Sequence, residues 1–155
     1  MGAEVENFRL SRNFWYSEVV ASRTADEHGI DNTPGPDHIA AATALALMSL
    51  QRLRDLAGRL GVNSWYRCPE LNSHPNIRGS RTSQHLTGEA ADVFSARHDP
   101  QKLAQIAWDH DLPVDQLIVY PERGIVHISY SRTAKTQRNQ FLVNRDDGKG
   151  PVPWR

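Results

Sequence analysis

Three polar side chains lie within or beside apolar segments, where such groups are costly to bury. Asp92 lies in the apolar run 90–94, and His127 lies in the apolar run 125–128. An ionised carboxylate is unfavourable in a buried strand unless it is paired or bound to a metal. His85 lies seven residues before Asp92, and a glycine between them lets the chain turn into the strand. Two histidines and one aspartate, with a fourth position left to water, are typical of a catalytic zinc site. We therefore predict that His85, Asp92 and His127 bind Zn²⁺.

The residues around these three side chains form separated motifs that follow one another in a recognisable order. The central motif is Ser-Gln-His-x-x-Gly-x-Ala-x-Asp at 83–92. It is preceded by Tyr-Arg-x-Pro-x-x-Asn at 66–72 and followed by Val-His-Ile-Ser at 126–129. Together they resemble the zinc D-Ala-D-Ala carboxypeptidase family, which includes D,D- and L,D-acting peptidases and many phage endolysins that act on peptidoglycan. The resemblance covers about residues 14–131.

The resemblance implies a zinc peptidase that hydrolyses a peptide bond in the peptidoglycan stem peptide or cross-link. It assigns the zinc ligands to His85, Asp92 and His127. Arg67 matches the arginine that lies near the metal and contacts the substrate carbonyl or carboxylate, which implies a catalytic and a substrate-binding role. Ser83 would hydrogen-bond the peptide or a ligand, or would only cap the turn before His85.

The general base is the role for which the sequence offers the weakest match. Amide hydrolysis needs a carboxylate that moves a proton to the leaving amine. In much of the family this carboxylate lies three residues before the last histidine ligand, where this chain has Gly124. In related branches it comes from the preceding strand, near the position of Tyr120. Glu122 is the nearest carboxylate, and we expect it to be the base. Two other carboxylates are poorer candidates: Glu89 and Asp115.

A hairpin is expected to place further side chains beside His127. Pro121-Glu122-Arg123-Gly124 separates two β-rich runs, 115–120 and 125–130. If Tyr120 pairs with Ile125, alternation puts Gln116, Ile118 and Tyr120 on the face of His127. Tyr120 would then contact the substrate as a hydrogen-bond donor in the transition state.

The order of the remaining elements predicts an α+β fold. Helices are expected at about 14–25, at about 37–59 with Asp37 as the cap, and at 99–110. The second of these is expected to stop near Gly61. A short strand is expected at 63–67 and another at 90–94. Helices first and a short sheet later indicate one domain, with N-terminal helices packed on a small antiparallel sheet that carries the zinc site. Residues 132–155 are expected to form a polar tail with a loose end at 146–151.

Composition excludes several classes of protein. Eighteen basic residues balance eighteen acidic ones, so no global field recruits nucleic acid or an anionic membrane. No apolar run approaches the roughly 20 residues that span a bilayer. Cys68 is the single cysteine, which excludes an internal disulfide and a cysteine-rich zinc site. Residues 1–10 lack the apolar core of a secretory signal. We expect a monomer made in the cytoplasm, which acts on the cell wall after release or as part of a virion.

Two classes of function remain open on the sequence alone. The first is a zinc-dependent peptidoglycan peptidase, such as a phage endolysin or a cell-wall remodelling enzyme. The second is a catalytically inactive, zinc-stabilised binding or virion structural module of the same fold. Arg67 favours the first, because a purely structural zinc site does not need it. Gly124, at the position where much of the family has a carboxylate, favours the second.

Overall fold

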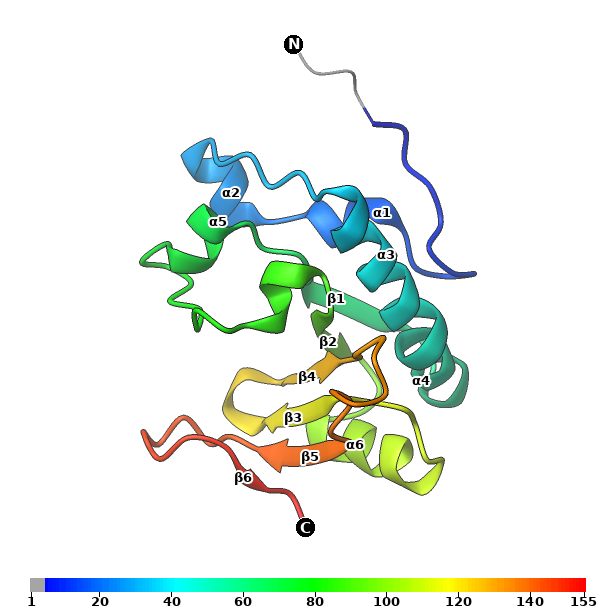
Figure 1. Ribbon diagram of the computed structural model, residues 1–155. Helices are drawn as coiled ribbons and strands as arrows, with labels where there is room; N and C mark the ends of the chain where they lie inside the picture. The colour runs from blue at the N-terminus through cyan, green and yellow to red at the C-terminus, as the bar shows by residue number, and fades with distance from the viewer. Residues whose placement is uncertain (1–4) are drawn as a thin grey trace.

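In the computed structural model, which describes residues 5–155, helices dominate the first half of the chain and strands the second (Figure 1). The α-helices are α1 (Tyr16–Val20), α2 (Arg23–His28), α3 (Pro36–Leu45), α4 (Gln51–Ala57), α5 (Pro69–Ser73) and α6 (Pro100–Asp109). The strands are β1 (Leu60–Ser64), β2 (Ala90–Ser95), β3 (Gln116–Tyr120), β4 (Ile125–Ser129), β5 (Gln140–Val143) and β6 (Val152–Pro153). One α+β domain with an N-terminal helical layer confirms the fold class that the sequence predicts.

The long helix predicted for 37–59 is present as a continuous run from Pro36 to Ala57 that includes a π-helical segment. A π-helical segment, Ala46–Leu50, joins α3 to α4. The helix begins one residue before Asp37, because Gly35 is the N-cap and its N–H donates to Nδ1 of His38 at 3.0 Å. It ends before Gly58, whose φ of 89° is incompatible with continuing the helix.

The helix therefore ends at Ala57, close to the predicted end at about 59, but the prediction that it stops near Gly61 is wrong. Gly61 lies inside β1 and pairs with Phe94 of β2. A Cβ on Gly61 would lie 2.3 Å from the Phe94 ring, so the glycine leaves room for an aromatic ring to lie across the strand.

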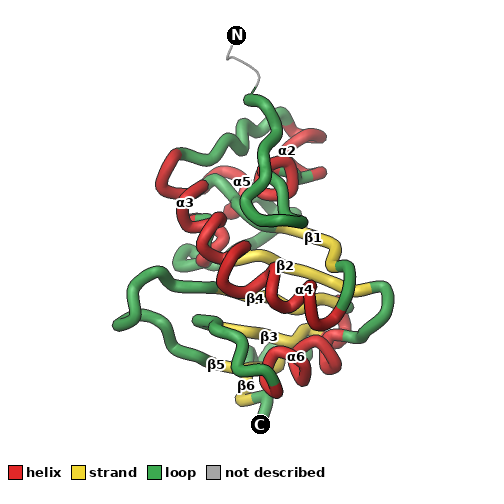
Figure 2. Tube along the Cα trace, turned by 90° about the vertical axis from the view of Figure 1, so that its right-hand side faces the viewer, coloured by secondary structure: helices red, strands yellow, loops and turns green. Residues whose placement is uncertain are grey.

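The sheet has the order β1-β2-β4-β3-β5-β6, and β3 with β5 is its parallel pair. One face is covered by helices: α6 packs on β2, β3 and β4 and lies beside α4, as Figure 2 shows. Alternation sends the apolar side chains of the central strands into this interface. These side chains are Ala91, Val93, Leu117, Val119, Val126 and Ile128, all of them fully buried. The opposite face of the same strands, which α6 does not cover, carries Asp92 and His127 beside the apolar side chains of Ile118 and Ile125.

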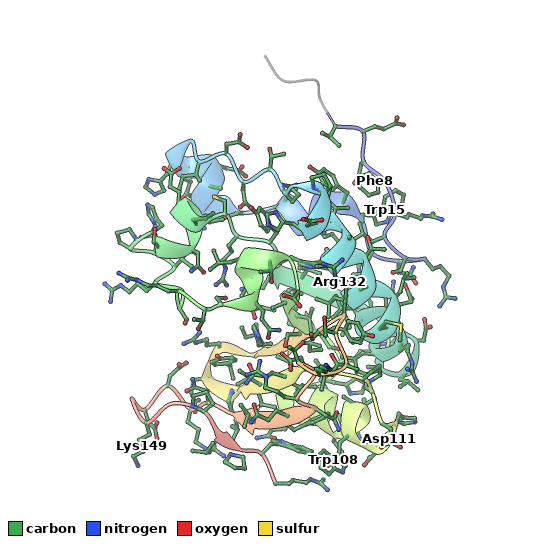
Figure 3. The ribbon with its side chains drawn as sticks, in the orientation of Figure 1. Phe8, Trp15, Trp108, Asp111, Arg132 and Lys149 are labelled. Carbon is green, nitrogen blue, oxygen red and sulfur yellow. The ribbon has the colours of Figure 1, made fainter. Side chains whose placement is uncertain are left out.

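The C-terminal residues differ from the predicted polar tail. β5 pairs along β3, and β6 pairs with β5 at the sheet edge. Phe141 and Trp154 pack against Trp108 of α6, with ring centroids 5.1 Å and 5.9 Å from the Trp108 ring. Figure 3 labels Trp108 at the end of the molecule away from Phe8 and Trp15. The short apolar run 141–143 and Trp154 hold a segment whose remaining residues are mostly polar, which explains why the overall composition of 132–155 concealed these strands.

Among the described residues, no helix combines the length and the apolar character that a membrane span requires.

Candidate metal centre and cleft

Two of the predicted metal ligands are neighbours across the sheet. Asp92 of β2 and His127 of β4 are register partners, and Nδ1 of His127 lies 3.0 Å from Oδ1 of Asp92. The residues that flank both of them point into the core, so alternation places both polar side chains on the uncovered face. Antiparallel pairing of β2 with β4 thus brings together residues 35 positions apart in the chain.

His85 reaches the same point from a short 3₁₀ helix, η2 (Gln84–Thr87). Ser83 caps this helix, because its Oγ accepts from the His85 N–H at 3.2 Å. Gly88 then takes a left-handed φ of 79°, which turns the chain into β2 as the sequence indicates. The result places Nε2 of His85 3.3 Å from Oδ1 of Asp92.

The other ring nitrogen of His85 fixes its tautomer. Nδ1 lies 2.6 Å from the carbonyl oxygen of Trp65, which only accepts, so Nδ1 carries the proton. In the neutral ring, Nε2 then presents a lone pair toward a carboxylate oxygen. Two acceptors at this separation repel each other unless a cation lies between them. A backbone carbonyl behind a histidine is also the arrangement that orients imidazole ligands on metals.

Burial also affects the pKa values of His85 and Asp92. Burial lowers the pKa of His85 below its ordinary value and so favours the neutral ring, although the nearby Asp92 opposes this effect. Burial also disfavours ionised Asp92. The contacts with the two histidines outweigh that penalty and hold the pKa of Asp92 well below its ordinary range. The carboxylate is therefore ionised and the imidazole neutral, which are the forms that bind a metal.

One ligand atom from each of His85, Asp92 and His127 lies within 4.8 Å of the other two. Two imidazoles and a carboxylate match the donor preference of zinc, and three protein ligands leave a fourth position open. The donor set, the ionisation states and the opposed acceptors all fit a bound divalent cation.

Arg67 lies directly beside the cluster. Its Nη2 donates to Oδ2 of Asp92 at 3.2 Å, and its Nε donates to Oγ of Ser64 at 2.9 Å. The backbone N–H of Arg67 donates to the carbonyl of His85, so the segment after β1 is tied to η2. With a side chain only 15% exposed, the guanidinium is held in position at the metal cluster.

The cluster lies in a cleft of about 600 Å³ on the uncovered face of the sheet. Its wall includes the predicted ligands, Arg67, and the two predicted substrate contacts Ser83 and Tyr120. The remaining lining residues are Ile77, Arg78, Gly79, Ser80, Thr82, Gln84, Gln116, Arg123, Ile125 and Arg138. Within residues 5–155, Asp92 is the one carboxylate that lines this cleft.

Glu122 lies outside that lining. It is exposed in the 3₁₀ turn η3 (Pro121–Arg123), between β3 and β4. Tyr120 pairs with Ile125 and Ile118 with His127, which confirms the hairpin register that the sequence analysis considers. Burial raises the pKa of the Tyr120 phenol, with Arg123 opposing and Asp92 adding to the effect. Tyr120 is therefore a protonated donor at neutral pH, whereas the role of Glu122 stays a prediction.

The sequence analysis missed three of the four arginines that line the cleft: Arg78, Arg123 and Arg138. Arg123 stacks over the Tyr120 ring at 4.5 Å and pairs with Asp146 from the C-terminal segment. Arg138 lies in the segment assigned to a polar tail and pairs with Asp115 at 2.7 Å. The high share of arginine among the cations was the available signal, but no local motif placed these side chains at the site.

Comparison with known families places most of this domain within one of them. A family model described as Peptidase M15 matches residues 12–129, a span that includes the three predicted ligands and Arg67. No curated protein matches the chain.

Proposed function

The chain belongs to the peptidase M15 family of zinc metallopeptidases, and from this membership and its cleft we propose that it hydrolyses a peptide bond in peptidoglycan. The substrate is the stem peptide or the cross-link, and the biological setting is a phage endolysin or a cell-wall remodelling enzyme. The observation that carries the proposal is the cluster of His85, Asp92 and His127 in an open cleft, with the Arg67 guanidinium held beside it.

His85, Asp92 and His127 hold the zinc in this proposal, His85 through Nε2 and His127 through Nδ1. When bound, zinc lowers the pKa of coordinated water and polarises the scissile carbonyl. Arg67 stabilises the negative charge that develops on the carbonyl oxygen, because its position is fixed before the reaction begins. Ser83 and Tyr120 both line the cleft and contact the peptide in this proposal.

The proton transfer is assigned to Glu122, with Tyr120 as the alternative donor. Glu122 acts only if substrate binding brings the η3 turn toward the cluster, because its side chain is outside the cleft lining. Tyr120 already lines the cleft, and its phenol donates a hydrogen bond without changing its ionisation.

A second candidate function is favoured by one specific observation. Asp92 is the single carboxylate among the described residues that line the cleft, and it already contacts Arg67 and the two histidines. It is therefore not free to act as a general base. A zinc-stabilised binding or virion structural module of the same fold would need no general base and would keep the cluster for stability.

The experiment is mass spectrometry of purified peptidoglycan after incubation with zinc-loaded protein, with and without a chelator. The peptidase proposal expects new stem-peptide fragments that the chelator abolishes, and the mass of each fragment identifies the bond. Glu122→Gln and Tyr120→Phe are compared at equal zinc content, and a loss of about 10²–10⁴-fold in rate identifies the proton-transfer residue. Absence of fragments from every wall preparation would refute hydrolysis and favour the binding module.

A further inference from the structure

The charges around the cleft balance except at one position. Four arginines line it, and three of them have a dedicated aspartate: Arg67 with Asp92, Arg123 with Asp146 and Arg138 with Asp115. Arg78 has no acidic partner among residues 5–155. The uncompensated positive charge of the cleft wall therefore belongs to Arg78.

Arg78 is held in a defined conformation even though it is exposed. Its backbone takes a left-handed φ of 52°, and its N–H donates to the carbonyl of His74 at 2.9 Å. The side-chain Nε donates to the carbonyl of Pro75 at 3.1 Å. This contact uses one donor edge of the guanidinium and leaves both terminal nitrogens available for a planar, bidentate partner.

Hydrogen bonds from Asn72 anchor the loop that carries Arg78, residues 74–83. The Asn72 carbonyl accepts from the Gly79 N–H at 2.8 Å, and its side-chain Nδ2 donates to the Ser80 carbonyl at 2.9 Å. A Cβ on Gly79 would lie 2.0 Å from Oδ1 of Asn72, so a glycine is needed where the loop crosses this side chain. Asn72 is buried, with 3% of its surface exposed, and these contacts hold the loop against the cleft.

Hydroxyl groups on the same loop complete a polar rim. Ser80 and Thr82 both line the cleft, and their hydroxyl oxygens lie 3.1 Å apart. An arginine with two free terminal nitrogens and two hydroxyls that line the same cleft are suited to a carboxylate, which accepts several hydrogen bonds at once. Neutral peptide groups would leave the positive charge uncompensated.

We propose that Arg78, with Ser80 and Thr82, forms a subsite that binds a carboxylate of the peptide substrate, at the rim of the cleft that contains the metal cluster. This inference rests on the proposed peptidase function and deepens it, because it selects acidic peptides over neutral ones. Two carboxylates of a stem peptide have the required chemistry: the C-terminal α-carboxylate and the α-carboxylate of a γ-linked D-glutamate.

The test measures binding rather than turnover, by stopped-flow fluorescence anisotropy of N-terminally labelled peptides on zinc-loaded protein, read before hydrolysis begins. Three probes are used: L-Ala-γ-D-Glu-L-Lys-D-Ala-D-Ala, the same peptide with a C-terminal carboxamide, and the same peptide with D-isoglutamine. Wild-type protein is expected to bind the parent peptide about tenfold more tightly than one of the two amides. The amide that loses affinity identifies which carboxylate occupies the subsite.

Arg78→Gln is expected to bind all three peptides equally, and Arg78→Lys to keep part of the preference, since it keeps the charge but loses the planar fork. Arg81→Gln is the matched control, because Arg81 is an exposed arginine of the same loop that does not line the cleft. It is expected to retain the wild-type preference. Zinc content and melting temperature are measured for each variant, so that a folding defect is recognised.

Three outcomes would overturn the subsite: no measurable binding of the parent peptide, equal wild-type affinity for acid and amide forms, or an unchanged preference in Arg78→Gln. The result is distinguishable from failure of the proposed activity. A protein that releases no fragments from peptidoglycan but shows the Arg78-dependent preference has the subsite and lacks the hydrolysis.

Discussion

Asp92 contacts three side chains at once, and each contact constrains its ionisation. Its Oδ1 faces His85 and His127, and its Oδ2 accepts from Arg67. The side chain is 10% exposed, so water does little to stabilise the charge. A bound divalent cation compensates this carboxylate more completely than the single guanidinium does. We therefore expect metal binding and folding stability to depend on the same residue.

Asp92→Asn tests this dependence with little change in shape. The amide keeps the volume of the carboxylate but removes its charge, so the site retains two histidines and loses zinc. The variant is expected to contain less than a tenth of the wild-type zinc and to melt like chelated wild-type protein. Elemental analysis and thermal unfolding measure both quantities.

Asp109→Asn is the control for Asp92→Asn, since Asp109 is an exposed residue at the end of α6 and its side chain hydrogen-bonds only with Gln105 among the described residues. Its zinc content and melting temperature are expected to match the wild type. Full zinc occupancy in Asp92→Asn would contradict the ligand assignment.

In this proposal Arg67 stabilises the charge that develops during the reaction and does not bind the metal. Arg67→Ala is expected to keep its zinc and to lose about 10²–10³-fold in kcat/KM, the usual effect of removing one donor that stabilises developing charge. Arg67→Lys keeps a charge but loses the bond from Nε to Ser64, so an intermediate rate is expected. Initial rates on a wall-derived peptide at equal zinc content measure the effect. Wild-type activity in Arg67→Ala would leave the residue a structural role only.

At the scale of elements, the turn between η2 and β2 sets the distance between two ligands. Gly88 has a left-handed φ, and a Cβ there would lie 2.4 Å from the backbone oxygen of His38 in α3. An alanine would meet both the conformational penalty and the backbone of a packed helix. The position of α3 therefore limits which residue can occupy the turn that joins His85 to Asp92.

Gly88→Ala is expected to destabilise the fold by about 2–4 kcal/mol, from a left-handed penalty of about 1–2 kcal/mol plus overpacking against the α3 backbone. Gly29→Ala is a matched control, because Gly29 also has a positive φ but a Cβ there meets nothing within 4 Å. It is expected to lose only the conformational part. Urea unfolding of both variants measures the difference, and equal losses would show that the contact with α3 is accommodated.

The sequence predicted helix starts and strands correctly where a capping residue or an alternating pattern lay within the element itself. The cap at Asp99 preceded α6, and alternation in 90–94 and 125–128 identified the central strands and the side chains on their uncovered face. The start and end of the long helix were misplaced by local signals. Gly35 has no capping side chain, and Gly58 rather than Gly61 takes the conformation that ends the helix.

Long-range pairing limited what the sequence could predict of the cleft. Arg123 and Arg138 are positioned by Asp146 and Asp115, partners 23 residues away in each case. Nothing in the local pattern of either arginine indicates that partner. The C-terminal strands were missed for the same reason, since their stability comes from parallel pairing with β3 and from contacts with Trp108.

At the scale of the whole molecule, Asp115 links the cleft to the C-terminal segment. It is 1% exposed, and its carboxylate accepts from Nε2 of Gln84 at 2.8 Å and from Nε and Nη2 of Arg138 at 2.9 and 2.7 Å. Its backbone groups also pair, with the carbonyl of Ser129 and the N–H of Gln140. One buried carboxylate thus joins η2, the central hairpin and the residues that lead into β5.

These contacts make folding stability depend on pH. Burial disfavours the Asp115 charge, but hydrogen bonds from Arg138 and Gln84 outweigh it and lower the pKa of Asp115 below its ordinary value near 4. A carboxylate with a lowered folded-state pKa contributes stability above its unfolded pKa, and this stability is lost as pH falls through the folded pKa. The contribution is therefore complete above about pH 5 and declines below pH 4.

Asp115→Asn should remove this contribution together with its pH dependence. At pH 7 the variant is expected to be less stable than wild type by about 2 kcal/mol, the usual range for hydrogen bonds to a charged group. The gap should narrow as pH falls from 5 to 3, because wild type then loses the charge that the variant lacks. Urea unfolding of both proteins at each pH measures this difference in the free energy of unfolding. A chelator is present throughout, so that release of zinc by acid does not contribute. Titration of Asp92 is common to both proteins and cancels. A gap that stays constant from pH 7 to 3 would mean that the Asp115 charge contributes nothing, and that its role is limited to shape and neutral hydrogen bonding.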